Sequence, residues 1–180
     1  MRTSNGNWTV TIDPGHGGRD PGAVHGGIRE ADIAFEVAGH LGRMLEEKEV
    51  QVRFTHRGLP ADQRVGNPER VARAAGSGVF ISIHCNAFTL PTAHGTETFF
   101  WRNDQGHELA RRVQVRLQGL LRTANRGVKE RRFTVLVQNR PAILVELAFL
   151  SNPQDRQLLI TRQEDMAAAI AQGYWDWVKA

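Results

Sequence analysis

Segments with the composition of β-strands alternate along this chain with segments that have the apolar spacing of amphipathic helices. The strand-like segments are short apolar runs bounded by glycine, proline and polar residues; they cover residues 8–13, 50–55, 79–84, 96–101, 133–137 and 142–147. The helix-like segments repeat apolar residues at helical intervals; they cover residues 30–47, 62–75 (with a start that Pro68 makes ambiguous), 108–121 and 163–179. This alternation predicts a single-domain α/β sandwich in which helices flank a mostly parallel central sheet of about six strands. The succession of strands between residues 96 and 147 predicts that one or two of them are antiparallel.

The composition is that of one folded domain covering residues 1–180. Of the 180 residues, 41% are hydrophobic and 23% are charged, which excludes a disordered or fibrous chain. No apolar run approaches the roughly 20 residues needed to cross a bilayer, so membrane insertion is not expected. Residues 1–7 lack the apolar segment of a secretory signal. The single cysteine, Cys85, allows neither an intramolecular disulfide nor a cysteine-based zinc site.

The net charge of +4 comes with 23 basic residues, most of which are arginine. Such a balance could suit a polyanionic partner, either nucleic acid or an anionic cell wall. No long run of like charges is present, however, and +4 is modest for 180 residues. We therefore expect an ordinary solvated surface and no nucleic-acid partner.

Four polar residues occupy positions where α/β sheets form their sites, at the carboxyl ends of strands. His16 follows the first strand in a glycine-rich loop, His84 ends the third strand, and Glu146 lies in the last apolar strand. Glu30 begins the first helix, and the glycine-rich loop could fold it back beside His16. Each residue alone also has an ordinary structural explanation: a loop histidine often only hydrogen-bonds, and the helix dipole favours a glutamate in the first turn.

Taken together, these residues fit metal-dependent hydrolysis. Two histidines and a carboxylate are the ligands of a catalytic zinc ion that keeps one position for water, although non-haem iron enzymes use the same set. Glu146 lies in the apolar run AILVEL, where a buried carboxylate must meet a cation, a hydrogen-bond donor or a metal-bound water. It is therefore a candidate general base that later acts as general acid.

Several stretches resemble the type 3 family of zinc-dependent N-acetylmuramoyl-L-alanine amidases, which cleave peptidoglycan. The matching stretches occur in family order and cover roughly Val10 to Val178. They are IDPGHGGRDPGA (12–23), IREADIAFEVA (28–38), FISIHCNA (80–87), GTETFF (95–100), RGVKERRFTVL (126–136) and PAILVELAFLSNPQD (141–155).

The resemblance implies one catalytic zinc ion held by His16, Glu30 and His84, with Glu146 as the catalytic residue. The implied reaction is hydrolysis of the amide bond between N-acetylmuramic acid and L-alanine, which places the chain at the cell wall, outside the cytoplasm. Asn86, which follows the third strand, and Arg140, in a loop that could border the cleft, are weaker candidates for substrate contacts.

The chain departs from the family pattern in three places. Cys85 stands where alanine is usual, Ala148 where glycine is usual, and the motif before the third strand is degraded across residues 63–75. Because neighbouring side chains of a strand point to opposite faces, we expect Cys85 to be a packed thiol and not a fourth metal ligand.

Some family members carry a helical insert that plugs the site, between the third-strand histidine and the next strand. Here only residues 85–94 separate His84 from Gly95, too few for an autoinhibitory helix, and we expect an open cleft. Two alternatives remain beside the amidase and the iron enzyme: another zinc peptidase on a related fold, and a wall-binding module without activity. The oligomeric state is left open.

Overall fold

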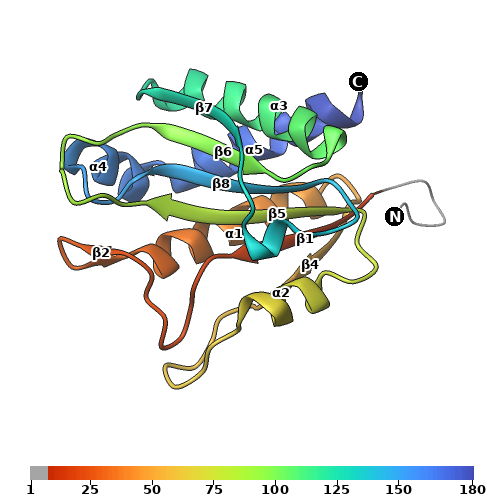
Figure 1. Ribbon diagram of the computed structural model, residues 1–180, viewed down its shortest axis with the longest axis horizontal. Helices are drawn as coiled ribbons and strands as arrows, with labels where there is room; N and C mark the ends of the chain where they lie inside the picture. The colour runs from red at the N-terminus through yellow and green to blue at the C-terminus, as the bar shows by residue number, and fades with distance from the viewer. Residues whose placement is uncertain (1–7) are drawn as a thin grey trace.

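A six-stranded sheet with the strand order β4-β1-β5-β8-β6-β7 forms the centre of the molecule (Figure 1). The computed structural model describes residues 8–180. The strands of the sheet are β1 (Thr9–Pro14), β4 (Gln51–Phe54), β5 (Val79–Asn86), β6 (Thr96–Phe100), β7 (Asn125–Glu130) and β8 (Ala142–Phe149). A small antiparallel hairpin, β2 (Val24–His25) with β3 (Ile28–Arg29), lies apart from the sheet.

The sheet is mostly parallel, as the sequence predicts. Strands β4, β1, β5 and β8 run parallel to one another, β6 is antiparallel to β8, and β7 is parallel to β6. Two of the six strands are therefore reversed. The second of them was wrongly placed from the sequence: Thr134–Leu136 form the short 3-10 helix η1, whereas the strand is β7, Asn125–Glu130. The apolar run at residues 133–137 looked like a strand in the sequence, but its residues Val135 and Leu136 are buried without being part of the sheet.

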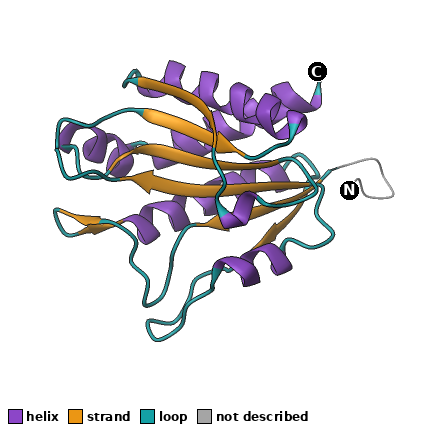
Figure 2. Cartoon of the chain, viewed as in Figure 1, coloured by secondary structure: helices purple, strands orange, loops and turns teal. Residues whose placement is uncertain are grey.

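Helices cover the two faces of the sheet unequally (Figures 1 and 2). The long helices α1 (Glu30–Glu46), α3 (Asp104–Leu121) and α5 (Gln163–Val178) pack against one another and cover one face. The other face carries only the short α2 (Asn67–Arg73) and η1. None of the helices in residues 8–180 is long and apolar enough to span a membrane.

Helix boundaries differ from the prediction where capping residues decide them. The helix predicted over 62–75 begins only at Asn67, because Gly66 has extended backbone and Pro68 fits the first turn. Helix α3 begins at Asp104, where the side chain of Asn103 accepts a hydrogen bond from Gly106 N (2.7 Å). Helix α4 (Pro153–Thr161) was not predicted, although Asn152 and the proline after it are a helix-start signal.

Side-chain alternation along β5 and β8 separates two apolar clusters from each other. Ile83, Cys85 and Val145 point into the large cluster beneath the long helices, while Phe80 and Leu144 join a smaller cluster with Val135 and Leu136 under η1. By the same alternation, His84 and Glu146 point to the thinly covered face.

Two glycine-to-alanine substitutions in the long helices should have opposite effects on the stability of the fold. A Cβ at Gly173 in α5 would lie 2.6 Å from the Cα of Val113 in α3, whereas nothing lies within 4 Å of one at Gly119. We expect Gly173→Ala to lower the free energy of unfolding by about 1–3 kcal/mol through overpacking. Gly119→Ala should raise it by about 0.5–1 kcal/mol through helix propensity. Urea unfolding measures both; stabilisation by Gly173→Ala would contradict the close approach of α3 and α5.

Candidate active site

Three side chains from separate parts of the chain converge at the carboxyl end of the sheet. The Oε1 atom of Glu30 lies 3.2 Å from His16 Nε2 and 2.8 Å from His84 Nδ1. One potential ligand atom from each residue lies within 4.8 Å of the other two. The structure thus brings together the three predicted ligands, and their donor set and spacing fit a divalent metal ion such as zinc.

The strand order explains this convergence. His16 follows β1 and His84 lies near the end of β5, and these two strands are parallel neighbours. Glu30 is the first residue of α1, and its Oε2 accepts a hydrogen bond from Ala23 N (3.0 Å) across the β2–β3 hairpin. The glycine-rich loop and hairpin therefore return the chain to the sheet, as the sequence predicts for Glu30.

Two glycines are required by close contact with the candidate ligands. A Cβ on Gly15 would lie 2.5 Å from the imidazole of His84, and one on Gly22 would lie 2.6 Å from Glu30 Oε2. Gly22 also has a positive φ of 65°, which other residues rarely adopt. Larger residues at these positions would displace the ligands themselves.

The three candidate ligands perturb one another's protonation. Burial alone would raise the pKa of the Glu30 carboxyl, but hydrogen bonds from His16 and His84 outweigh it and hold that pKa well below its usual range. Burial alone would lower the pKa of both histidines, yet the bond to Glu30 raises each of them. The pocket formed by these side chains therefore favours a positive charge next to Glu30, which a proton or a metal ion can supply.

Asp20 orients His16 from behind. Its Oδ1 lies 3.0 Å from His16 Nδ1 and accepts a hydrogen bond from Gly22 N (3.2 Å). Because a carboxylate accepts, Nδ1 carries a proton toward Asp20, and Nε2 is the nitrogen that faces Glu30. A carboxylate behind a histidine is the usual second partner of a metal-ligating imidazole.

A buried ion pair holds the loop that carries His16. Arg70 of α2 donates from Nη1 to Asp13 Oδ1 (2.7 Å) and to Pro14 O (2.6 Å), and from Nη2 to His16 O (2.6 Å). The Nε2 of His56 also contacts the carbonyls of Pro14 and His16, at 3.1 Å each. His16 has a positive φ of 61°, a conformation uncommon for histidine. Arg70 and His56 therefore fix a strained backbone at a candidate ligand.

Glu146 lies on β8 beside His84, its partner in the parallel register. Its Oε2 is buried, and within residues 8–180 it has no hydrogen-bond partner. Burial raises the pKa of this carboxyl to about 7; His84 counteracts the shift, while Glu30 and Glu97 add to it. A carboxyl group in this state can both accept and release a proton near neutral pH.

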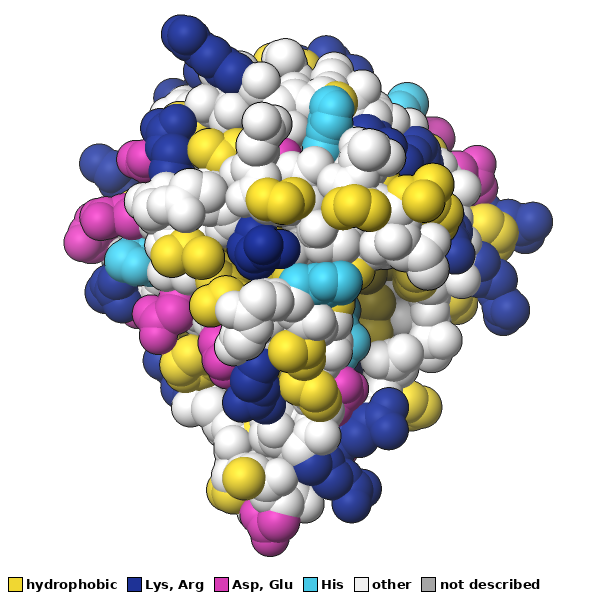
Figure 3. Space-filling model, turned by 90° about the vertical axis from the view of Figure 1, so that its left-hand side faces the viewer, with side chains coloured by type: hydrophobic (Ala, Val, Ile, Leu, Met, Phe, Trp, Pro, Cys, Tyr) yellow, Lys and Arg dark blue, Asp and Glu magenta, His cyan; other side chains and the backbone are white. Residues whose placement is uncertain are grey.

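A cavity of about 210 Å³ on the thinly covered face is lined by most of these groups, though not by Glu30 or His56. Its walls include Asp13, His16, Asp20, Arg64, Val65, Asn67, Arg70, His84, Phe133, Val135, Leu144 and Glu146. Figure 3 views the molecule from the carboxyl end of β5 and shows a hollow with histidine side chains beside it and hydrophobic side chains within it. The cavity is the candidate active site.

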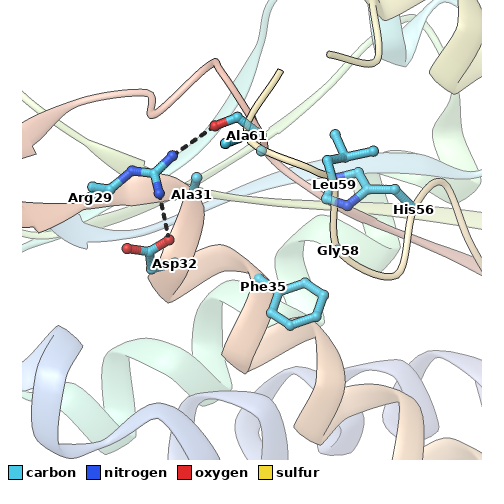
Figure 4. Close-up of a pocket in the computed structure, with 10 residues that line it drawn as sticks. Arg29, Ala31, Asp32, Phe35, His56, Gly58, Leu59 and Ala61 are labelled. Atoms are coloured by element: carbon cyan, nitrogen blue, oxygen red, sulfur yellow. Dashed lines mark hydrogen bonds and ion pairs between the residues drawn. The ribbon is translucent and has the colours of Figure 1, made fainter. Parts of the chain in front are cut away.

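A second hollow, of about 260 Å³, lies on the other side of the glycine-rich loop (Figure 4). Phe35, His56 and Leu59 line it, and its one arginine, Arg29, is already bound to Asp32 (3.4 Å) and to Gly18 O (2.9 Å). It contains none of the predicted catalytic or ligand residues, so its larger size does not make it the site.

The weaker sequence candidates are placed differently. Arg140 precedes the amino end of β8 and donates to the carbonyls of Ala74 and Ser77, so the prediction that it borders the cleft is wrong. Asn86 donates to Glu97 Oε1 (2.5 Å), and its contact with substrate stays a prediction. Cys85 is a buried thiol in the core beneath the long helices, as predicted.

Sequence reasoning missed two groups of residues. It assigned no role to Arg70 in residues 63–75, although this arginine holds the loop that carries His16; among the arginines of this segment the sequence does not single it out. It also missed Glu97 of β6, which lies opposite Glu146 in the sheet and accepts hydrogen bonds from Lys129 and Arg126 (3.3 Å to the latter). The acidic residue within the strand run TETFF was its signal.

An α/β sheet that gathers two histidines and a carboxylate, with a buried carboxyl group on the next strand, has the arrangement of a metal-dependent hydrolase. Comparison with known protein families identifies the kind of hydrolase. The sequence profile of the N-acetylmuramoyl-L-alanine amidases matches residues 10–175, and the chain belongs to this family of enzymes.

Similarity to individual proteins supports the same family assignment. The crystal structure of N-acetylmuramoyl-L-alanine amidase from Clostridium difficile 630 superimposes with a TM-score of 0.90 at 33% identity, covering 97% of this chain and 98% of that one. Uncharacterized protein YqiI of Bacillus subtilis is 37% identical, over 91% of this chain and 80% of its own length. N-acetylmuramoyl-L-alanine amidase LytC of Bacillus subtilis is 33% identical over 84% of this chain, which spans only 31% of it.

The buried ion pair predicts a strong effect of one substitution on stability. Arg70→Met leaves the Asp13 carboxylate buried without its cation, and we expect the free energy of unfolding to fall by about 3–5 kcal/mol. Arg111→Met, which removes an arginine paired with Glu108 on the exposed surface, should leave the urea midpoint close to that of the unaltered protein. Equal midpoints for the two variants would show that the buried pair does not hold the fold.

Proposed function

We propose that this chain hydrolyses the amide bond between N-acetylmuramic acid and L-alanine in peptidoglycan, with one zinc ion held by His16, Glu30 and His84. The observation that carries the proposal is the convergence of these three donors beside the buried carboxyl group of Glu146. Family membership supports the same bond as the target. The name of the similar LytC supports the same reaction.

The protein groups divide the work as follows. Bound zinc would supply a Lewis acid for the amide carbonyl and would lower the pKa of water toward about 7. The imidazoles of His16 and His84 must be neutral to act as ligands, and Asp20 holds the His16 ring in the tautomer that leaves Nε2 free.

Glu146 carries the proton. Its carboxylate takes a proton from the attacking water as the new C–O bond forms, and returns it to the nitrogen of the departing L-alanine as the C–N bond breaks. The products are the lactyl carboxylate of the glycan and a free peptide amine. The apolar surroundings of Glu146 favour its neutral form, which assists the second transfer.

Because the proposed substrate is peptidoglycan, we propose that the protein works at the cell wall, outside the cytoplasm. The names of relatives such as the probable cell wall amidase LytH of Staphylococcus saprophyticus support this location. The segment between β5 and β6, residues 87–95, contains no helix. We therefore keep the prediction that the cleft works without an activator protein.

Replacing the proton carrier tests the mechanism. We expect Glu146→Gln to lower the rate of peptide release from peptidoglycan by at least ~10²-fold, because a general base contributes at least that much. Zinc content, measured by elemental analysis, should not change. Glu36→Gln, on the exposed face of α1, is the matched control. Full activity of Glu146→Gln would refute the assignment of the base.

Removing a ligand tests the metal site. We expect His16→Ala and His84→Ala each to lose both bound zinc and activity, since two remaining donors bind zinc weakly. His40→Ala, on the outer side of α1, should retain one zinc ion per chain. Mass spectrometry of digested peptidoglycan identifies the bond: new N-terminal alanine is expected, and binding to peptidoglycan with no released peptide would indicate a wall-binding module instead.

A further inference from the structure

The cavity holds more groups than the proposed chemistry uses. Apart from the ligands, Asp13, Asp20, Arg70 and Glu146, its wall consists of an apolar part and a polar rim. Val65, Phe133, Val135 and Leu144 form the apolar part, and Arg64 and Asn67 form the rim. A substrate that fills the cavity must contact both parts.

Arg64 is the cation of this cavity that retains free donors. Within residues 8–180 its guanidinium makes no hydrogen bond; its nearest charged neighbour is Asp20, with 3.7 Å between Arg64 Nε and Asp20 Oδ2. The Arg64 side chain is 57% exposed. Arg70, the other arginine in the wall, is buried, and its N–H groups already donate hydrogen bonds to Asp13 and to three backbone carbonyls. Of the two arginines in the cavity wall, Arg64 is therefore the one that can form a bidentate contact with an anion entering from solvent.

Arg64 lies close to the reacting groups. The two oxygens of Asp20 connect it to the site: Oδ1 contacts His16 Nδ1 (3.0 Å) and Oδ2 faces Arg64. The guanidinium is thus separated from a candidate metal ligand by a single carboxylate. An extended chain of two residues spans about 7 Å, so an anionic group two residues beyond the scissile amide can reach this rim.

Peptidoglycan carries such a group. In its peptide stem the alanine is followed by a glutamyl residue joined through its side chain, which leaves the α-carboxyl either free or amidated. We propose that Arg64 binds the free α-carboxylate of this second stem residue, while the apolar wall contacts the methyl group of the alanine. This inference rests on the proposed function and adds the specificity of the same site.

The contact with Arg64 should affect the choice between free and amidated stems more than the overall affinity for substrate. An exposed arginine loses little hydration energy on binding a carboxylate, so the contact contributes modestly. An amide at the same place cannot form the charge-assisted pair, and Asp20 already occupies one side of the guanidinium. We therefore expect the site to discriminate between free and amidated stems by about tenfold, the effect of one hydrogen bond to a charged group.

Two muropeptides test the assignment. Each consists of the disaccharide and a tripeptide stem, with either glutamate or isoglutamine as the second residue. With the zinc-loaded protein we expect kcat/KM to be about tenfold higher for the glutamate form. In Arg64→Gln this preference should disappear, because kcat/KM for the glutamate form should fall to the value for the isoglutamine form. Raising the salt concentration should also reduce the preference of the unaltered protein, because an exposed ion pair is screened.

Arg57→Gln is the matched control. Arg57 is an exposed arginine with a loose carboxylate neighbour, Glu46 at 3.8 Å, and it lies outside the cavity. We expect this variant to keep the preference for the glutamate form. Loss of the preference in both variants would indicate an effect of net charge and would overturn the role of Arg64.

Binding provides a readout that does not need turnover. In zinc-loaded Glu146→Gln, calorimetry should show tighter binding of the glutamate muropeptide, and adding Arg64→Gln should make the two dissociation constants equal. Equal kcat/KM values for both forms in the unaltered protein, or a preference that survives Arg64→Gln, would overturn the inference alone. Cleavage of neither form between muramic acid and alanine would instead refute the proposed function, and the binding comparison would still decide the role of Arg64.

Discussion

The carboxylate of Glu30, held between His16 and His84, is the interaction on which the site depends. A buried carboxylate is costly unless hydrogen-bond donors or cations surround it, and here both imidazoles and the backbone N–H of Cys85 (3.1 Å) meet the same oxygen. This requirement closes the glycine-rich loop and the β2–β3 hairpin onto the sheet, because Glu30 can reach these donors only if the chain turns back. The fold and the candidate metal site therefore share the same contacts.

A second layer of buried charge connects the site to the stability of the domain. Asp13 accepts hydrogen bonds from Arg70, from Thr55 Oγ1 (2.5 Å) and from Ser82 Oγ (2.7 Å), which come from α2, the end of β4 and β5. The same Arg70 holds the carbonyl of His16. Because one guanidinium serves both purposes, damage to the network should loosen the ligand loop before the core beneath the long helices, in which neither Asp13 nor Arg70 takes part.

The sequence predicts those parts of the structure whose signal is local. Strands β5 and β8 and helices α1 and α5 were identified because burial on fixed faces imposes a clear apolar pattern. Strand β7 was missed because it is a polar edge strand that is half-exposed to water. The proximity of His16, Glu30, His84 and Glu146 was predicted from their positions after strands and from the family resemblance; their roles as metal ligands and catalytic residue stay predictions. Arg140 was misplaced and Arg70 was overlooked for another reason. Arg140 bonds to residues 66 and 63 positions away in the sequence, and Arg70 to one 57 positions away, and only the topology brings such distant residues together.

The unequal covering of the sheet explains why the chemistry lies where it does. The long helices bury one face completely, so any polar group on that side would lose its water without a replacement. The opposite face has only α2 and η1, and a cavity of about 210 Å³ remains at the carboxyl ends of β5 and β8. Glu146 can therefore be desolvated enough to hold a proton near neutral pH and still face a space that admits a substrate. A long helix packed on that side as well would complete the core and remove the site.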